Sequence, residues 1–395
     1  MSEITRTRPN ADQMDELIRA VRAISGQYDT TSAASIVAAI RSGQGNLIPN
    51  GSVFKETHAV YGDIYFATRA KNVHKVAGDA ARPTITIQPI YLLSSNGGNS
   101  AATFQYDRPE AMFAPLAAAI PNGTIVQFTV PNTYSSWAAG TYSFTASADL
   151  PVGTVLCLSG NAGTALTSLN VAAYASHKAT TALATMAISS GAGDATVDLG
   201  SWETDGNHPQ RISYGSNNEA ESNFFQFLNG DSGDQFMDSV WVPKTKYDMM
   251  STYMTNTKGF LGGFSDEFRS YLGLCAIPNI TNTVFEAQDS SYTKNTAYTH
   301  NGYFFLPSRK EIYGTSENAN EDVESQFDYY KDIATADADK LMYAKNASAP
   351  TTYWLRTPHA GYASNVRICS TGSGGALVNY TASSAHGAAP LAILA

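Results

Sequence analysis

The sequence is poor in charged side chains. Lys, Arg, Asp and Glu make up 15% of its 395 residues, against roughly 25% in typical soluble domains. The formal net charge is −9, and no run of basic residues occurs along the chain. Nucleic-acid binding needs clustered cations that displace counterions, so we expect no nucleic-acid partner. The acidic balance also gives no reason to expect adhesion to anionic lipid.

Cysteine is scarce as well. Cys157, Cys275 and Cys369 are far apart, and none lies in a CxxC pair. An odd, scattered set of this kind is not a disulfide framework. We therefore expect the thiols to be packed as small apolar groups in a chain that folds in a reducing cytoplasm. One disulfide among the three is the alternative.

Long hydrophobic runs are also missing. No stretch of about 18 apolar residues occurs, so we expect no insertion into a membrane. The N-terminal residues MSEITRTRPNADQ lack the basic and apolar segments of a secretory signal. A chain made in a host cytoplasm can still act outside the cell if it leaves by lysis as part of a virus particle.

Motifs of catalysis and metal binding are absent too. The sequence has no HExxH, GxSxG or Walker A motif, and no two of its histidines are close enough in sequence to form a local metal pair. The segment Asn229–Asp234 resembles a calcium loop but lacks the ligand spacing of an EF-hand. We interpret it as a polar turn after a helix, and we expect no metal and no cofactor.

Two amphipathic helices are predicted near the N-terminus. Residues 10–25 place apolar side chains on one stripe, and a second, Ala-rich helix is predicted from Ser32 to Ser42. The stripe must be covered either by the chain's own next domain or by another copy or particle protein. We assign residues 1–45 to anchoring or oligomerisation.

Residues 46–200 have the pattern of a β domain. Apolar or alternating segments bounded by Gly, Pro and Asn turns predict strands at 84–88, 125–130, 140–145 and 155–158. Short strands at near-regular spacing favour a sandwich or a jelly roll. Residues 159–198 fit either further strands or an extended linker. The fold class expected for the chain is α+β, mostly β, with a sandwich-like middle domain.

Aromatic residues become denser from residue 201 onward. Short helices are predicted at Phe264–Leu272 and from Ser308 to Ile312. In the segment Tyr353–Pro358 (YWLRTP) the Trp and Leu should be core, and Arg356 stands next to them. Burying a guanidinium without partners is expensive. We therefore expect Arg356 to tie loops together through its five donors.

The segment that follows mixes Tyr, Ser, Asn and His with glycine. Tyr gives a large contact area at low entropy cost, and Ser and Asn give adaptable hydrogen bonds, so the composition fits a recognition surface. It fits a Gly/Ser-rich final hairpin equally well. The candidate contact residues are His359, Tyr362, Ser364, Asn365, Arg367, Asn379, Tyr380 and His386.

These blocks resemble a widespread uncharacterised domain of phage and gut-bacterial proteins, whose members typically show WWLRSP, a variable segment and then GVRPAL. Here YWLRTP matches the first block. The second block is matched at Gly387, Pro390, Leu391 and Ile393, and further blocks fit in order at Ser222–Asn229, Gly259–Leu272 and Tyr303–Ser308. The resemblance implies structural roles for Trp354, Arg356, Pro358, Gly387 and Pro390.

Two departures from the family pattern concern arginine. Ala388 and Ala389 replace the usual Val-Arg, and Phe225, Gln226 and Phe227 replace the usual Arg-x-Trp. We expect the loop contacts of those arginines to be missing here.

The family is similar to the C-type-lectin-like fold of retroelement-diversified variable proteins and of formylglycine-generating enzymes. The enzymes need a reactive cysteine pair near the C-terminus, and only Cys369 lies there, so we expect no enzyme. The variable proteins expose Asn, Tyr, Ser and His in their final segment. The resemblance therefore implies a C-type-lectin-like recognition domain over residues 201–395.

The expected function is that of a phage virion protein of the tail-fibre, head-fibre or receptor-binding type. It would bind a bacterial surface glycan or protein, contact other virion proteins through its N-terminal helices, and assemble with itself, as a homotrimer by resemblance to fibre proteins. One alternative is a purely structural capsid decoration or collar protein. Another is a polysaccharide-degrading enzyme with two carboxylates about 5–9.5 Å apart, for which the candidates are Asp205, Glu219 and Asp266.

Overall fold

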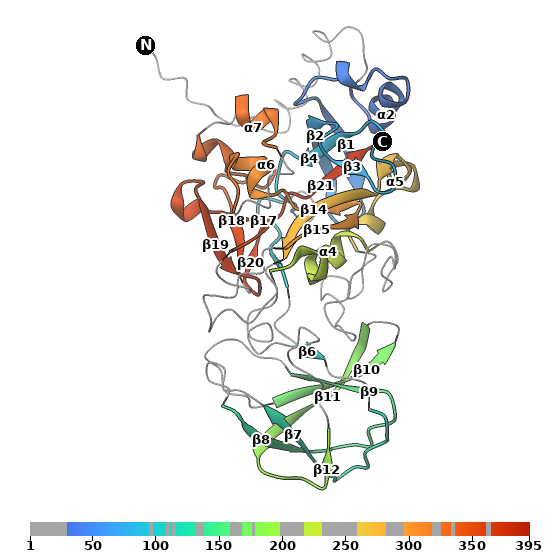
Figure 1. Ribbon diagram of the computed structural model, residues 1–395, viewed down its shortest axis with the longest axis vertical. Helices are drawn as coiled ribbons and strands as arrows, with labels where there is room; N and C mark the ends of the chain where they lie inside the picture. Colours follow the sequence, from blue (N-terminus) through green and yellow to red (C-terminus); the bar gives the residue numbers. More distant parts are fainter. Residues whose placement is uncertain are drawn as a thin grey trace.

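The computed structural model describes residues 30–94, 98–107, 111–112, 116–130, 138–158, 168–175, 178–197, 217–230, 259–281, 296–317, 325–332, 336–360 and 365–395. Strands dominate and the helices are short, so the fold is mostly β with few helices, as predicted. Figure 1 shows a larger body that contains both the blue and the red ends of the described chain, and a smaller, green body with strands β6 to β12.

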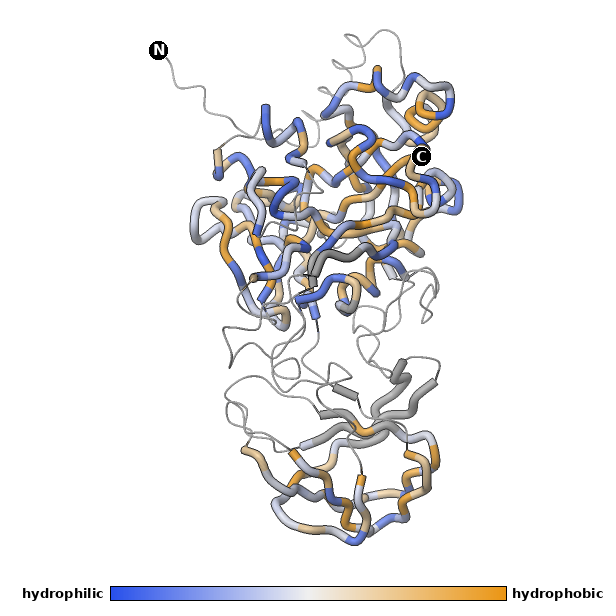
Figure 2. Tube along the Cα trace, in the orientation of Figure 1, coloured by the Kyte–Doolittle hydropathy of each residue, from blue (hydrophilic) through white to orange (hydrophobic). Residues whose placement is uncertain are grey.

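A six-stranded sheet forms the centre of the larger body, and it draws on both ends of the sequence. Its main path is β1 (Val53–His58), β2 (Gly62–Lys71), β4 (Ile85–Pro89), β21 (Leu391–Leu394) and β13 (Leu272–Gly273), and β16 (Phe304–Phe305) also pairs with β21. Every residue of β4 and β21 is buried, as expected for strands covered on both faces. Figure 2 accordingly shows hydrophobic segments running through the centre of this body.

The structure divides the chain differently from the boundaries predicted at residues 45 and 200. Strand β4 pairs with β21, so that Ile87 lies opposite Ala392. One hydrophobic core contains Phe66 from the predicted middle domain together with Phe304 and Trp354 from the predicted C-terminal domain. Sequence alternation identifies strands but not their partners, and these partners are about 300 residues apart.

The second predicted helix is α2 (Ala33–Arg41), with the Ser32 side chain as its N-cap. Its apolar residues Ile36, Val37 and Ile40 are at most 3% exposed and belong to the same core as the central sheet. This apolar face is covered by the chain itself, so it is not available for the anchoring contact predicted for it. The helix predicted at residues 10–25 lies outside the described residues.

The smaller body is a seven-stranded sheet in the order β12-β7-β8-β11-β10-β9-β6. Its strands are β6 (Ala111–Met112), β7 (Ile125–Val130), β8 (Gly140–Thr145), β9 (Thr154–Leu158), β10 (Ser168–Ala175), β11 (Lys178–Ser190) and β12 (Ala195–Thr196). The strands predicted at 125–130, 140–145 and 155–158 are confirmed, and the described part of 159–198 forms strands rather than a linker. The core around Phe128 and Phe144 shares no described residue with the cores of the larger body.

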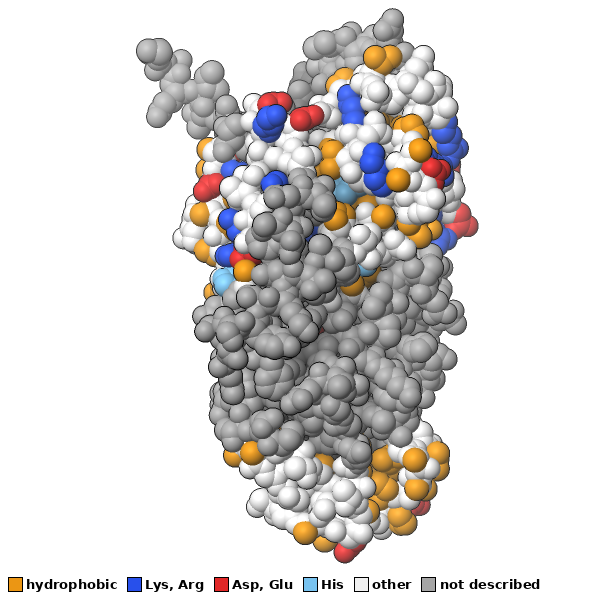
Figure 3. Space-filling view, viewed as in Figure 1, with side chains coloured by type: hydrophobic (Ala, Val, Ile, Leu, Met, Phe, Trp, Pro, Cys, Tyr) orange, Lys and Arg blue, Asp and Glu red, His pale blue; other side chains and the backbone are white. Residues whose placement is uncertain are grey.

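The smaller body is almost free of charge. Between residues 111 and 197 the sequence has only three charged residues, Asp149, Lys178 and Asp194. In Figure 3 its described surface is mostly white and orange, whereas blue and red side chains gather on the larger body. The low charge content of the whole chain is thus concentrated in this unit.

The chain leaves and re-enters the larger body at neighbouring points. The amide of Phe224 donates to the carbonyl oxygen of Tyr106 at 3.0 Å, and the amide of Asn223 donates to Oδ1 of Asp107 at 3.1 Å. Strands β6 to β12 lie between these two points in the sequence. The smaller body is therefore an insertion into a fold that is closed without it.

Smaller elements complete the larger body. Three strands, β3 (Lys75–Val76), β14 (Cys275–Thr281) and β15 (Thr296–Gly302), form one sheet, and β5 (Phe104–Gln105) pairs with β20 (Ala385–His386). A further sheet contains β17 (Tyr353–Pro358), β18 (Asn365–Cys369) and β19 (Leu377–Thr381). The helices are α4 (Asn223–Leu228), α5 (Asp266–Tyr271), α6 (Arg309–Tyr313) and α7 (Asp328–Asp332). Serine side chains cap α4, α5 and α6, and the predicted helices at 264–272 and 308–312 are confirmed.

We predict that the larger body folds without the insertion. Replacing residues 109–216 by about six Gly and Ser residues, which span roughly 13 Å, should leave a cooperative transition with a Tm within about 4 °C of the full chain, a change of about 1 kcal/mol. A fragment of residues 201–395 should not fold, because it lacks β1, β2 and β4. Thermal unfolding followed by circular dichroism checks both. A folded 201–395 fragment would contradict the sheet order.

Candidate functional site

The sheet of β17, β18 and β19 is called the C-terminal sheet below. One buried carboxylate, that of Glu311 in α6, binds side chains and backbone next to this sheet. It is the N3 residue of a capping box, and its Oε2 accepts from the Ser308 amide at 2.8 Å. Arg356 donates from Nη1 to Oε2 at 2.8 Å and from Nη2 to Oε1 at 2.7 Å. Nε2 of His74 lies 2.7 Å from Oε1. His74, Glu311 and Arg356 are 2%, 0% and 1% exposed, so solvent does not reach this network.

Arg356 uses its remaining donors on the backbone. Nη1 donates to the carbonyl oxygen of Leu306 at 2.7 Å, and the guanidinium carbon lies 5.5 Å from the ring centroid of Phe305. Burial alone would raise the pKa of Glu311. Arg356 and His74 outweigh burial and lower that pKa to about 2. The carboxylate is therefore ionised at neutral pH and holds β17 against α6 and the segment before it.

The other residues of the two matched blocks also lie in the core. Nε1 of Trp354 donates to the carbonyl oxygen of Phe104 at 2.7 Å, and the Trp354 amide donates to the carbonyl oxygen of Gly387 at 3.0 Å. A Cβ on Gly387 would lie 3.0 Å from Cδ1 of Leu92 and 3.2 Å from the carbonyl oxygen of Thr352, so this position favours glycine. Pro358 and Pro390 are buried.

The predicted contact residues do not form one surface. In the antiparallel pair β18–β19, Arg367 lies opposite Asn379, and Val366 lies opposite Tyr380. Residues opposite each other share a face, and neighbours along a strand lie on opposite faces. Asn379 and Arg367 are therefore on one face and Tyr380 on the other. Tyr362 and Ser364 lie outside the described residues.

The face with Arg367 and Asn379 is called the polar face. On it, Glu317 accepts hydrogen bonds from three residues. Arg367 donates from Nε to Oε2 at 2.7 Å and from Nη2 to Oε1 at 2.6 Å, and Nη1 of Arg309 donates to Oε2 at 2.5 Å. The amide of Ala360 donates to Oε1 at 3.0 Å. Burial alone would raise the pKa of Glu317, but the hydrogen bonds from Arg367 and Ala360 outweigh it and lower the pKa. Sequence reasoning missed Glu317 because it is one of several carboxylates in an acidic stretch.

Two further predicted residues join this polar face. Nδ2 of Asn365 donates to Oδ1 of Asn379 at 3.1 Å, and the amide of His359 donates to the carbonyl oxygen of Asn365 at 2.9 Å. Burial lowers the pKa of His359, and the positive charge of Arg367 lowers it further. The polar face thus brings together His359, Asn365, Arg367 and Asn379.

An aromatic group lies on the other face. Tyr380 is 52% exposed, and its ring packs edge-on against His386, with 4.9 Å between the ring centroids. His386 packs edge-on against the buried Trp354 at 4.6 Å. Nε2 of His386 is buried and has no hydrogen-bond partner among the described residues. Burial lowers the pKa of His386 to about 4, so its ring is neutral at pH 7.

The carboxylates proposed for catalysis do not line a common cleft. Glu219 is 1% exposed, accepts from the Leu306 amide at 2.8 Å, and lies 3.2 Å from Nε2 of His300. Asp266 is on the surface of α5 and pairs with Arg269. Asp205 lies outside the described residues. Within the described ranges, no three His, Cys, Asp or Glu residues are grouped so as to hold a metal ion.

Two of the three thiols are packed in the core, as expected. Cys275 and Cys369 are buried and unpaired with each other, and burial raises the pKa of Cys369. A thiol of this kind is a poor nucleophile. The side chain of Cys157 is not among those described. None of the described helices is long and apolar enough to cross a membrane.

A comparison of the sequence with protein-family models gives one match. Residues 194–395, just over half of the chain, match the family model described as a domain of unknown function, DUF6273. The chain belongs to the DUF6273 family. No curated protein and no solved structure matches the chain.

The DUF6273 region contains all the predicted contact residues, as well as Glu311 and Arg356. It does not contain His74, nor strands β1, β2 and β4 of the central sheet, of which β4 pairs with β21. In this chain the residues that support the DUF6273 region are therefore supplied partly by the sequence before it.

We predict that Arg356→Met lowers the free energy of unfolding by about 3–5 kcal/mol, because it leaves a buried carboxylate short of its main partner. The matched control is Arg269→Met, which removes an exposed Arg–Asp pair and should cost less than about 1 kcal/mol. Urea denaturation of both variants measures the difference. Equal losses would mean that the Glu311 network contributes no more than a surface pair.

Stability should also depend on the protonation of His386. The pKa is about 4 in the folded chain and near 6.5 when unfolded, so the unfolded state binds more protons between these values. The contribution is fully present above pH 6.5 and is lost as the pH falls toward 4. We predict that His386→Gln reduces the loss of stability between pH 6.5 and pH 4, measured by urea denaturation. An unchanged pH profile would contradict this.

Proposed function

We propose that the chain is a phage virion protein of the tail-fibre, head-fibre or receptor-binding type, and that its C-terminal sheet binds a bacterial surface glycan or protein. The observation that carries the proposal is the exposure of Tyr380. Of the five large hydrophobic side chains that are exposed in the described part of the chain, it alone is aromatic. An exposed aromatic ring on a well-supported strand is suited to contact with a partner.

The support beneath Tyr380 favours recognition because it fixes the ring. His386 lies between Tyr380 and the buried Trp354 of β17. Two residues after Trp354 in the same strand, Arg356 is bound by Glu311. A ring that is already ordered loses little conformational entropy on binding. Contact residues on a rigid strand are also placed more accurately than those on a loop.

The phage setting and the C-type-lectin-like fold expected for residues 201–395 are part of the same proposal. They are supported by the ordered blocks from Ser222 to Leu394 that resemble the phage and gut-bacterial family, and by the mostly β architecture. Assembly with itself, as a trimer, would turn weak single contacts into avid attachment. Because the face of α2 is covered internally, a self-contact would have to use another surface.

A structural role in the particle, as a decoration or collar protein, is favoured by a different observation. Arg367 and Asn365, two predicted contact residues, already have partners within the chain in Glu317 and Asn379. Side chains held in this way stiffen the surface and leave fewer groups free for a ligand. In that case Tyr380 would pack against a neighbouring subunit.

The recognition proposal predicts that Tyr380→Ala reduces binding of the labelled full-length chain to a panel of bacterial strains by at least about tenfold, as expected for an interface hot spot. Val152→Ala is the matched control, because Val152 is 65% exposed and lies on the insertion. It should bind like the wild type. Thermal unfolding should show that both variants stay folded. Equal binding by the wild type and Tyr380→Ala would rule out this face as the binding site.

The structural alternative is tested on assembled particles. Hydroxyl-radical footprinting compares the oxidation of Tyr380 in the free chain and in the particle. Recognition predicts that Tyr380 stays reactive in the particle, and a decoration role predicts that it becomes protected.

A further inference from the structure

A second buried arginine, Arg69, lies at a β-bulge of the central sheet. The pairing of β2 with β4 shifts register between Thr68 and Ala70, so that Arg69 is an extra residue with no opposite residue in β4. A bulge redirects the side chain it carries, and bulges are common next to functional sites. Here the guanidinium carbon of Arg69 lies 3.9 Å from the ring centroid of Tyr329 in α7.

The guanidinium of Arg69 lacks a partner of opposite charge. Its Nε donates to Oε1 of Gln88 at 3.1 Å, whereas Nη1 and Nη2 form no hydrogen bond or ion pair with any described residue. Arg69 is only 4% exposed. A charged side chain that is buried to this extent is almost always paired. The two terminal nitrogens present parallel N–H groups, the arrangement that binds both oxygens of a carboxylate.

Gln88 supplies another donor without an acceptor. It is 0% exposed, and its Oε1 also accepts from the Tyr330 hydroxyl at 2.9 Å. Nε of Arg69 can only donate, which fixes the amide of Gln88 with its oxygen toward the guanidinium. The Nε2 atom of the same amide is buried and has no hydrogen-bond partner among the described residues. Donors of both side chains therefore lack an acceptor beside the guanidinium, and an anion would satisfy them together.

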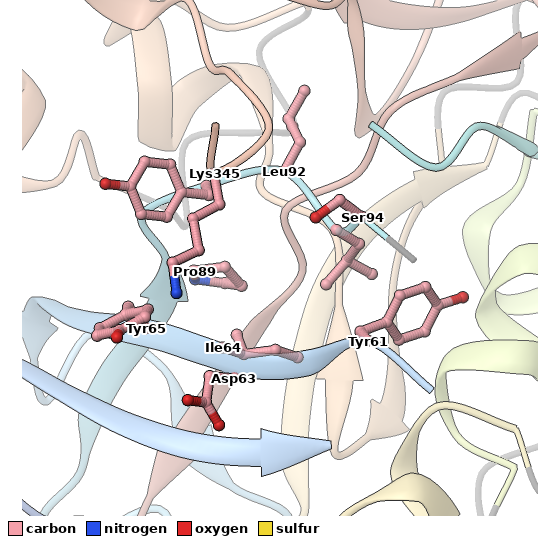
Figure 4. Close-up of a pocket in the computed structure, with 10 residues that line it drawn as sticks. Tyr61, Asp63, Ile64, Tyr65, Pro89, Leu92, Ser94 and Lys345 are labelled. Carbon is pink, nitrogen blue, oxygen red and sulfur yellow. The ribbon is translucent and has the colours of Figure 1, made fainter. Parts of the chain in front are cut away.

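The depression shown in Figure 4 is a different feature. It lies at Tyr61 to Tyr65, near the start of β2, and neither Arg69 nor Gln88 lines it. Its volume of about 20 Å³ has room for roughly one water molecule. A ligand of Arg69 would instead lie at the terminal nitrogens themselves. Because so little of Arg69 is exposed, that ligand must be small.

We propose that Arg69 and Gln88 bind the carboxylate of a small anion of the formate or acetate class. Its oxygens accept from Nη1 and Nη2 of Arg69, and one of them also accepts from Nε2 of Gln88. Arg69 and Gln88 precede the DUF6273 region, whereas Tyr329 and Tyr330 belong to it, so the anion would stabilise the contact between the two parts. The site is separate from the C-terminal sheet, and it neither rests on the proposed function nor tests it.

The test measures ligand binding to the full-length chain by ligand-observed NMR and by thermal unfolding. The probes are sodium formate, formamide as its neutral counterpart, and sodium chloride as a spherical anion at the same concentration. Arg69→Met keeps most of the apolar stem and removes the charge. Gln88→Glu is nearly isosteric and places a negative charge where Nε2 lies. The control is Arg269→Met, because Arg269 already pairs with Asp266 on the surface.

We expect formate to bind with a Kd of about 1–10 mM, near the limit for a ligand of three non-hydrogen atoms, and at least about tenfold tighter than formamide or chloride. Formate at about 100 mM should raise the Tm by about 3 °C. Arg69→Met and Gln88→Glu should each weaken binding at least about tenfold, and Arg269→Met should leave it unchanged.

Four results would overturn the proposal. These are no binding of formate, chloride binding as tight as that of formate, and undiminished formate binding in either Arg69→Met or Gln88→Glu. Because Gln88→Glu keeps the size of the side chain, it tests the site even if Arg69→Met does not fold.

Discussion

The larger body depends on the ion pair between Glu311 and Arg356, buried together with His74. Each partner comes from a different part of the chain: His74 precedes β3, Glu311 is in the first turn of α6, and Arg356 is in β17. Removing charges from water is costly, and close pairing with further hydrogen bonds offsets that cost only when the geometry is good. Here both carboxylate oxygens are engaged. The three segments must therefore meet at one point. This contact holds β17, the first strand of the β17–β18–β19 sheet, against α6.

Local features of this arrangement could be predicted from the sequence. Ser308 and Glu311 have the spacing of a capping box, and a helix begins there. Arg356 directly after the apolar Trp354 and Leu355 indicated a guanidinium that would need several acceptors, and it has them. Strands with clear alternation, such as β7, were also predictable, because alternation is a property of neighbouring residues.

Features set by distant contacts could not be predicted. Nothing in β4 indicates that its partner is the last strand of the chain, and this pairing is what removes the predicted domain boundary. The separation of Tyr380 from Arg367 depends on the register of β18 and β19. Composition cannot give that register. Nothing in the sequence distinguishes Glu317 from the other carboxylates near it, because its partners Arg309, Arg367 and Ala360 meet it only in the fold.

Charged residues are distributed unequally between the two bodies. The insertion has almost no charge, whereas the larger body holds the buried ion pairs and the candidate surfaces. Glu219, one of the carboxylates predicted for catalysis, is buried against His300, and Glu311 is buried against Arg356. Among the large hydrophobic side chains that the described part of the larger body exposes, Tyr380 is the aromatic one. The binding role that we propose rests on this exposed ring.

Native-state hydrogen exchange tests most directly whether both ends of the described chain form one cooperative body and the insertion another. Amides of β2 and β4 should exchange with the same opening free energy as those of β21 and β17, and amides of β7 and β8 should follow a separate opening. If the amides of β4 instead exchanged together with those of β7 and β8, and independently of β21, the division of the chain into these two bodies would be wrong.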